Sequence, residues 1–202
     1  MRTGEEGSRK QERLVLASSS PRRTQLLDML GIPHEVDPAH INEDPHSGER
    51  AEQLARRLAK EKALAVAKRR PRRWVLGADT VVVIDGELLG KPDSPLHAEA
   101  MLGRLAGREH QVVTAVALVR DGVAHEACDV TRVRFRSMTA ELIRAYVETG
   151  EPLDKAGAYG VQAGGAALVE RIEGDFFGVM GLPLRLVVSL LEQAGMPYRF
   201  GR

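Results

Sequence analysis

The sequence is poor in cysteine, contains no long apolar run and carries almost no net charge, and each shortage narrows the class of protein. The single cysteine, Cys128, excludes an internal disulfide and a cysteine-cluster zinc site, and it fits a reducing compartment such as the cytoplasm. No apolar run approaches the ~20 residues that a membrane-spanning helix requires, so we expect no membrane contact. The formal net charge of +1 at pH 7 indicates no particular partner.

Hydrophobic residues make up 43% of the 202 residues, which is enough for one substantial core. Residues 1–12 are polar and lack the apolar centre of a signal peptide, so we expect a flexible N-terminal tail before a single domain over residues 13–202. Apolar periodicity and turn residues predict strands at 13–17, 34–37, 74–76, 81–84, 112–119, 123–135 and 167–172, and helices at 21–30, 48–70, 94–105, 139–148 and 182–194. Because these elements alternate with several hairpins, the predicted fold is α/β with a mixed central sheet.

The segment from Ser18 to Arg23 is the first that indicates a binding site. Pro21 suits the first position of a helix, and Ser20 suits its N-cap. Arg22 and Arg23 then face the positive end of the helix dipole, an arrangement that is unfavourable unless an anion is present. Free backbone N–H groups, serine hydroxyls and two guanidiniums together form a phosphate cradle. An ordinary N-cap with solvated arginines is the alternative.

Asp79 lies between the apolar runs 74–76 and 81–84, so we expect its carboxylate near the core. An unpaired buried charge is strongly unfavourable, and the carboxylate therefore needs a cation, a metal or a polar network. A general base or a metal ligand meets this requirement. A structural aspartate that caps a turn is the alternative.

Two lysines occupy positions that suit a site. Lys62 falls on the apolar stripe of the helix predicted at 48–70, where a lysine either extends its stem to water or points into a site. Lys91 follows Gly90 after a hairpin. The string from Gly86 to Lys91 is one residue too short for a P-loop and has Pro92 in place of Ser or Thr, which excludes a Walker A motif.

The glycine-rich segment from Asp154 to Gln162 allows the backbone to approach a ligand closely. The Gln162 amide offers a donor and an acceptor to the edge of a base, and a plain surface turn is the alternative. The stretch from Arg50 to Arg73 holds ten basic residues against two acidic ones without interleaved aromatic residues, which favours a solvated helix face over nucleic-acid binding. The histidines between residues 34 and 46 lack zinc-ligand spacing.

Seven strings, which occur in order and span residues 16–183, resemble the Maf family of nucleoside triphosphate pyrophosphatases. They are LASSSPRR (16–23), EKA (61–63), GADTVV (77–82), GKP (90–92), HQVVTAVAL (110–118), DKAGAYGVQ (154–162) and GLP (181–183). The resemblance implies an elongated α/β fold, with helices flanking a central mixed sheet and two lobes around an active-site cleft. It also implies a cytoplasmic, house-cleaning hydrolase that releases nucleoside monophosphate and pyrophosphate by water attack at the α-phosphate, assisted by Mg²⁺ or Mn²⁺.

The resemblance implies roles for single residues as well. Asp79 matches the proton acceptor, and Glu35 matches an acidic residue that binds the metal together with it. The residues that match the phosphate site are Ser18, Ser20, Arg23, Lys62 and Lys91, of which the two lysines take a catalytic part. The residues that match the subgroup acting on dTTP and UTP are Arg22, Thr80 and Gln162. The sequence departs from the family pattern at Ser19, where many relatives have glycine, and at residues 173–178.

Two other functions stay open at this point. A purine house-cleaning pyrophosphatase that acts on ITP or XTP would share the fold and the reaction, and comparing dTTP, UTP and ITP as substrates would separate the two. A regulator of septum formation, acting through a partner or DNA, would use the basic stretch from Arg50 to Arg73. For the enzyme, we expect a nucleoside triphosphate as the ligand, consider a homodimer, and expect neither nucleic acid nor membrane as a partner.

Overall fold

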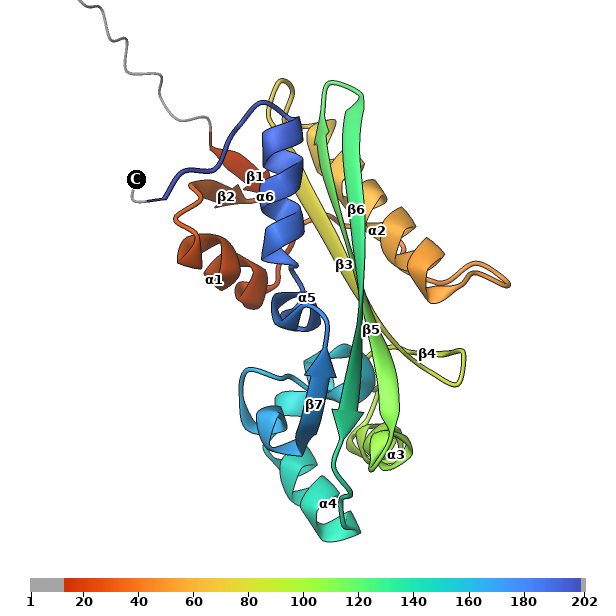
Figure 1. Cartoon of the computed structure of the whole chain (residues 1–202). Helices are drawn as coiled ribbons and strands as arrows, with labels where there is room; N and C mark the ends of the chain where they lie inside the picture. Colours follow the sequence, from red (N-terminus) through yellow and green to blue (C-terminus); the bar gives the residue numbers. More distant parts are fainter. Residues whose placement is uncertain (1–12, 201–202) are drawn as a thin grey trace, which may run out of the picture.

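The structure is a computed structural model that describes residues 13–200. The tail predicted for residues 1–12 lies outside the described residues, and the single domain over 13–202 stays a prediction. Figure 1 shows an elongated molecule in which long strands link two groups of helices. None of the helices in the described part is long and apolar enough to cross a membrane.

One mixed sheet forms the frame of the molecule. Its strand order is β2-β1-β3-β5-β6-β7, and β4 also pairs with β3. β1 is parallel to both of its neighbours, whereas the other pairs are antiparallel, so the predicted α/β fold with a mixed sheet is confirmed. The strands are β1 (Leu14–Leu16), β2 (His34–Val36), β3 (Val75–Ile84), β4 (Glu87–Leu89), β5 (Glu109–Arg120), β6 (Val123–Phe135) and β7 (Val169–Glu173).

The first lobe has helices on both faces of the sheet. Figure 1 shows α2 on one face of the long strands and α1 and α6 on the other. Gly77 lets α2 approach β3 closely, because a Cβ at this position would lie 2.1 Å from the Ala59 carbonyl oxygen. The helices of this lobe are α1 (Pro21–Met29), α2 (Ala51–Ala67) and α6 (Leu184–Gln193).

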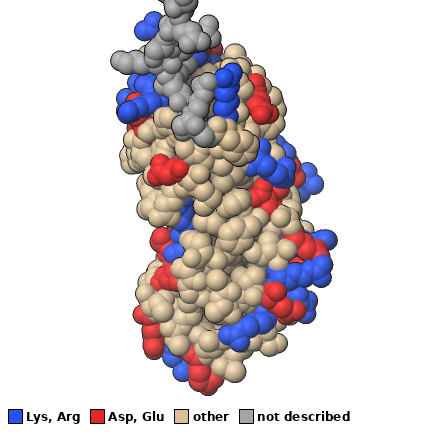
Figure 2. Space-filling model, turned by 60° about the vertical axis from the view of Figure 1, so that its left-hand side comes forward, with Lys and Arg blue, Asp and Glu red and all other residues tan. Residues whose placement is uncertain are grey.

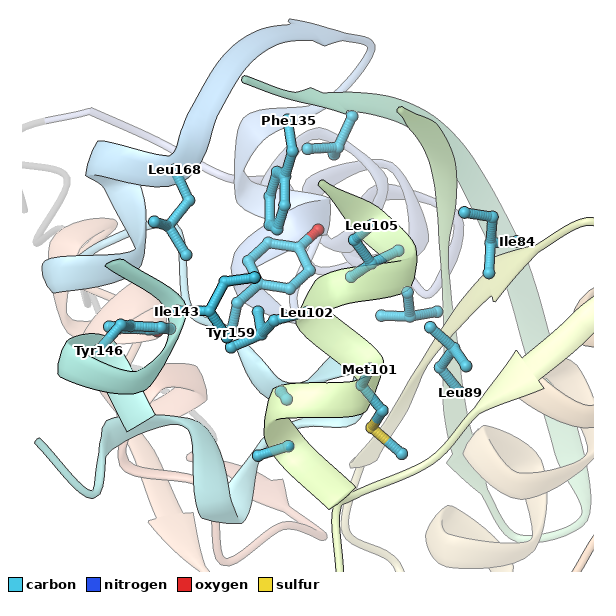
Figure 3. Packing of buried hydrophobic residues seen from close by; sticks show 14 of the residues in the cluster. Ile84, Leu89, Met101, Leu102, Leu105, Phe135, Ile143, Tyr146, Tyr159 and Leu168 are labelled. Carbon is cyan, nitrogen blue, oxygen red and sulfur yellow. The ribbon is translucent and has the colours of Figure 1, made fainter. Parts of the chain in front are cut away.

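The second lobe packs around the other ends of β3, β5 and β6. Figure 3 shows its core, in which the Phe135 and Tyr159 rings meet edge to face with their centroids 4.7 Å apart. Because the long strands belong to both lobes, they fix the position of one lobe relative to the other. The helices here are α3 (Pro95–Leu105), α4 (Ala140–Glu148) and the 3-10 turns η1 (Glu151–Asp154), η2 (Ala156–Ala158) and η3 (Gly164–Leu168), and α5 (Phe176–Met180) lies between the lobes.

Three features differ from the sequence-based predictions. The strands predicted at 74–76 and 81–84 are one continuous strand, because the backbone of Asp79 pairs with Ala115 regardless of its polar side chain. The short helix α5 and the three 3-10 turns were not predicted, since they are too short for an apolar periodicity to appear. Ser20 occupies the N-cap position of α1, but its side chain accepts no cap hydrogen bond, which leaves the hydroxyl available for a ligand.

Candidate active site

The candidate active site is a cleft at a gap in the edge of the sheet. β1 pairs with β3 at residues 75–76, and β4 pairs with β3 at residues 82–84. Between these pairings, residues 77–81 of β3 have a strand partner only on the β5 side within the described chain. Neighbouring side chains in a strand point to opposite faces, yet this gap lets both Asp79 and Thr80 line one opening.

The loop after β1 and the start of α1 form the first wall of the cleft. Arg23 donates from Nε to the Gly181 carbonyl oxygen at 2.8 Å and from Nη1 to Ser18 Oγ at 3.0 Å. Its Nη2 lies 3.4 Å from Thr80 Oγ1. Burial lowers the pKa of Arg23 from its usual value while the Asp79 carboxylate acts in the opposite direction, and a guanidinium stays charged at neutral pH. The wall therefore presents an oriented cation.

Lys62 crosses from α2 to the floor of the cleft. Its side chain is 9% exposed, and its Nζ donates to Asp79 Oδ1 at 2.6 Å and to Glu43 Oε2 at 2.8 Å. Asp79 is itself buried, with 6% of its surface exposed. The apolar stripe predicted for this helix therefore does place Lys62 in the cleft, where it pairs with the buried carboxylate that needs a cation.

The second lobe supplies the opposite wall. Lys91 follows β4, and Asp154, Lys155, Gly160 and Gln162 belong to the glycine-rich segment. Lys155 donates from Nζ to the Asp154 carboxylate at 2.6 Å. Burial acts to raise the pKa of Asp154, but this hydrogen bond and the nearby positive charges hold the pKa below its usual value.

The two walls enclose a cleft of about 390 Å³. Figure 2 shows basic and acidic residues where the molecule narrows between its lobes. The structure brings together nine of the predicted site residues in this cleft: Ser18, Ser20, Arg22, Arg23, Lys62, Asp79, Thr80, Lys91 and Gln162. The cleft also contains polar residues that the sequence reasoning did not select, namely Ser19, Glu43, Asp154, Lys155 and Tyr159.

Glu35, predicted as a metal ligand, does not line the cleft. It lies on β2, and its carboxylate is 3.2 Å from Arg73 Nη2 and 4.0 Å from Arg70 Nη1. Glu43 is the glutamate that reaches the cleft. The prediction is corrected accordingly, because two arginines already neutralise Glu35 and the loop after β2 carries Glu43 to Lys62 instead.

Two carboxylates, those of Asp79 and Glu43, therefore meet at the Lys62 ammonium. Carboxylates are suitable ligands for Mg²⁺, which proteins usually hold with one or two of them while substrate phosphates complete the shell. Among the described residues, no group of three or more His, Cys, Asp or Glu side chains is arranged to hold a metal.

The basic stretch from Arg50 to Arg73 is largely neutralised within the fold. Arg69 and Arg70 both bind Asp37, for example. The basic residues of this stretch with ion pairs are Arg56, Arg57, Lys60, Lys62, Arg69, Arg70 and Arg73. This pairing leaves little unneutralised charge on the side chains of this stretch.

The fold and the cleft define a class, an α/β protein with a cationic, serine-lined cleft between two lobes. The comparisons with known proteins agree: the model of the Maf-like protein family matches residues 13–194. A dTTP/UTP pyrophosphatase of Symbiobacterium thermophilum is 52% identical over 92% of this chain and 96% of its own length. A protein of the same name in Myxococcus xanthus is 52% identical over 91% of this chain and 93% of its own length. Another in Geobacter metallireducens is 48% identical over 91% of this chain and 96% of its own length. The chain belongs to the Maf family.

Proposed function

We propose that this protein hydrolyses dTTP and UTP to the nucleoside monophosphate and pyrophosphate. One observation carries the proposal: the buried Asp79 carboxylate faces a cleft whose walls carry arginine, lysine and serine donors. The names of the relatives, about half identical over more than nine-tenths of this chain, support the substrate class.

The chemistry of the proposed reaction suits these side chains. Attack of water on a phosphorus with several anionic oxygens requires removal of a proton and neutralisation of charge. Asp79 accepts the proton from water. Lys62 lies against Asp79 and orients its carboxylate, while Arg23 and Lys91 bind the phosphate oxygens from opposite walls of the cleft.

The metal belongs to the proposal as well. Mg²⁺ or Mn²⁺ would be held by the carboxylates of Asp79 and Glu43, and when bound it neutralises charge on the phosphates and the leaving pyrophosphate. Lys62 bridges these two carboxylates, so its ammonium marks a position where the chain stabilises positive charge. Dialysis against EDTA should abolish hydrolysis, and restoration by Mg²⁺ and by Mn²⁺ would compare the two ions.

Base choice would depend on the wall that the second lobe forms. Gln162 presents an amide that can pair with the carbonyl and N3–H edge of uracil or thymine, and cytosine offers a different order of donors and acceptors. A site that hydrogen-bonds one pattern rejects the mismatched one, because its buried polar groups are left unpaired. We assign Arg22 and Thr80 to the same selective contacts, as expected from the pyrimidine subgroup.

The test of the reaction is Asp79→Asn, with Asp85→Asn in the hairpin after β3 as the matched control. Loss of a general base lowers the rate by ~10²–10⁴-fold, so pyrophosphate release from dTTP should fall by that factor while nucleotide binding persists. The control should retain full activity. Near-wild-type turnover by a folded Asp79→Asn protein would remove Asp79 from this role.

The test of base choice is a substrate panel of dTTP, UTP, CTP, GTP and ITP for the wild type and Gln162→Ala. We expect dTTP and UTP to have the highest kcat/KM, and the variant to lose this preference more than it loses turnover. An enzyme that favours GTP or ITP over dTTP would refute the pyrimidine assignment and leave the pyrophosphatase assignment standing. Salt-sensitive DNA binding without hydrolysis would favour the regulator instead.

Location and assembly complete the proposal. We place the enzyme in the cytoplasm, because its one cysteine fits a reducing compartment and its proposed substrates are cytoplasmic nucleotides. A homodimer is the assembly that we propose to test, by light scattering on the purified protein. A monomer at all accessible concentrations would exclude it.

A further inference from the structure

The glycine-rich wall of the cleft is held from behind by two residues that do not line it. Tyr146 lies near the end of α4 with 6% of its surface exposed. Glu151 begins the 3-10 turn η1 that follows α4. The Tyr146 hydroxyl donates to Glu151 Oε1 at 2.9 Å and accepts the Gly160 backbone N–H at 3.3 Å.

The Glu151 carboxylate continues this network into the segment 160–165. Its Oε2 accepts the Gly164 N–H at 2.9 Å, and its Oε1 accepts the Gly165 N–H at 3.4 Å. Together with the bond from the Tyr146 hydroxyl, the Glu151 carboxylate accepts three hydrogen bonds, and all three lie behind the segment 160–165. Burial, followed by the hydrogen bond to Glu151, raises the pKa of Tyr146, so the hydroxyl stays protonated and able to donate.

Glycines make this close packing possible. A Cβ at Gly165 would lie 2.5 Å from the Gly160 carbonyl oxygen and 2.7 Å from the Tyr146 hydroxyl, and one at Gly164 would lie 2.9 Å from Glu151 Oε2. Gly160 also touches the functional side of the segment, because a Cβ there would lie 3.4 Å from the Gln162 Nε2 atom. Gly160 therefore links the two sides: its N–H binds the Tyr146 hydroxyl of the network, and its Cα faces the side chains of Lys155 and Gln162.

From this geometry we infer that Glu151 and Tyr146 are positioning residues that hold the segment 160–165 in the shape that directs Gln162 at the base. They act through the segment and touch no phosphate, so they set which nucleotide is preferred rather than how fast water attacks. The inference rests on the proposed function, in which Gln162 contacts the base.

The experiment compares Glu151→Gln and Tyr146→Phe with Glu148→Gln, an exposed glutamate on the same helix as Tyr146. Each of the first two variants removes hydrogen bonds behind the segment 160–165 and nearly preserves the size of the substituted side chain. We expect the ratio of kcat/KM for dTTP to kcat/KM for CTP to fall by about tenfold in both, the effect of one hydrogen bond to a charged group. The loss should appear in the KM for dTTP with its kcat nearly unchanged, and Glu148→Gln should match the wild type.

Two further measurements separate positioning from general destabilisation. If Glu151 acts through Gln162, the double variant Glu151→Gln/Gln162→Ala should discriminate no worse than Gln162→Ala alone. Hydrogen exchange should accelerate at the backbone amides of Gly160, Gly164 and Gly165 in Glu151→Gln and remain slow at the core of β5. Additive losses in the double variant, or accelerated exchange throughout the protein, would overturn the inference.

The outcomes also distinguish this inference from the function on which it rests. A wild-type protein that hydrolyses dTTP no better than CTP refutes the proposed base choice and this inference together. Unchanged discrimination in both Tyr146→Phe and Glu151→Gln, with a selective wild type and a selectivity loss in Gln162→Ala, overturns the inference alone.

Discussion

Neutralising Lys62 should affect this protein far more than neutralising Lys60, two residues away on the same helix. Lys62 Nζ lies 2.6 Å from Asp79 and 2.8 Å from Glu43, with a side chain that is 9% exposed. Lys60 also forms an ion pair, with Glu126 at 2.8 Å, but its side chain is 45% exposed. The substitutions Lys62→Met and Lys60→Met remove the same charge from the same helix and retain most of the apolar stem.

The magnitudes follow from burial. Removal of one partner of a buried ion pair costs about 3–5 kcal/mol, because the other charge stays buried without compensation. Asp79 borders an open cleft and has Arg23 nearby, so we expect the lower part of this range for Lys62→Met. An exposed ion pair contributes about 0–1 kcal/mol, which sets the limit for Lys60→Met. Because Lys62 orients the carboxylate of the proposed general base, its loss should lower kcat/KM by ~10²-fold or more in Lys62→Met alone.

The assay is urea unfolding of both variants together with pyrophosphate release from dTTP. If Lys62→Met and Lys60→Met lose equal activity, Lys62 has no special role in the cleft and its burial is a matter of packing. If Lys62→Met unfolds at the wild-type urea concentration, the ion pair with Asp79 contributes nothing net and the reasoning from burial is wrong.

Two further predictions concern stability. Burial lowers the pKa of His110 to about 4. Between pH 6.5 and 4 the unfolded chain therefore binds a proton that the folded chain does not. The free energy of unfolding should fall by up to about 3 kcal/mol as the pH drops through this range. His110→Gln should lose this part of the pH dependence and exposed His40→Gln should retain it, and urea titrations that show the same slope in all three proteins would contradict the assignment. Gly77→Ala should destabilise the protein by about 2–3 kcal/mol, because the new Cβ collides with α2. Gly103→Ala is the control and should be neutral or stabilising, since a Cβ at Gly103 has no atom within 4 Å. Equal melting temperatures for the two variants would show that α2 is not packed as described.

The parts of this protein that were predicted from the sequence depend on local patterns. The helix α2 follows from its apolar periodicity, and the same periodicity places Lys62 on the stripe that faces the sheet. The proline-arginine start of α1 and the turn glycines are likewise short-range features. Their physical basis, backbone geometry and side-chain spacing along one element, is present in the chain before any tertiary contact forms.

Only the tertiary structure decided which carboxylates share the cleft. Glu35 and Glu43 both precede α2, and their local sequence does not distinguish the glutamate that binds arginines from the one that reaches Lys62. The answer depends on the path of the loop from residue 37 to residue 50, which has little regular structure of its own.

The gap in the sheet edge and the network behind Gln162 are further examples. The gap depends on where β1 ends and β4 begins along β3, and no local pattern encodes the pairing of separate strands. Tyr146, Glu151 and the glycines at 160, 164 and 165 meet because α4 and η1 pack against α3, and η2 packs against α3 and β3. Sequence patterns thus determine which side chains an element offers, whereas the packing of distant elements determines which of those side chains face one another.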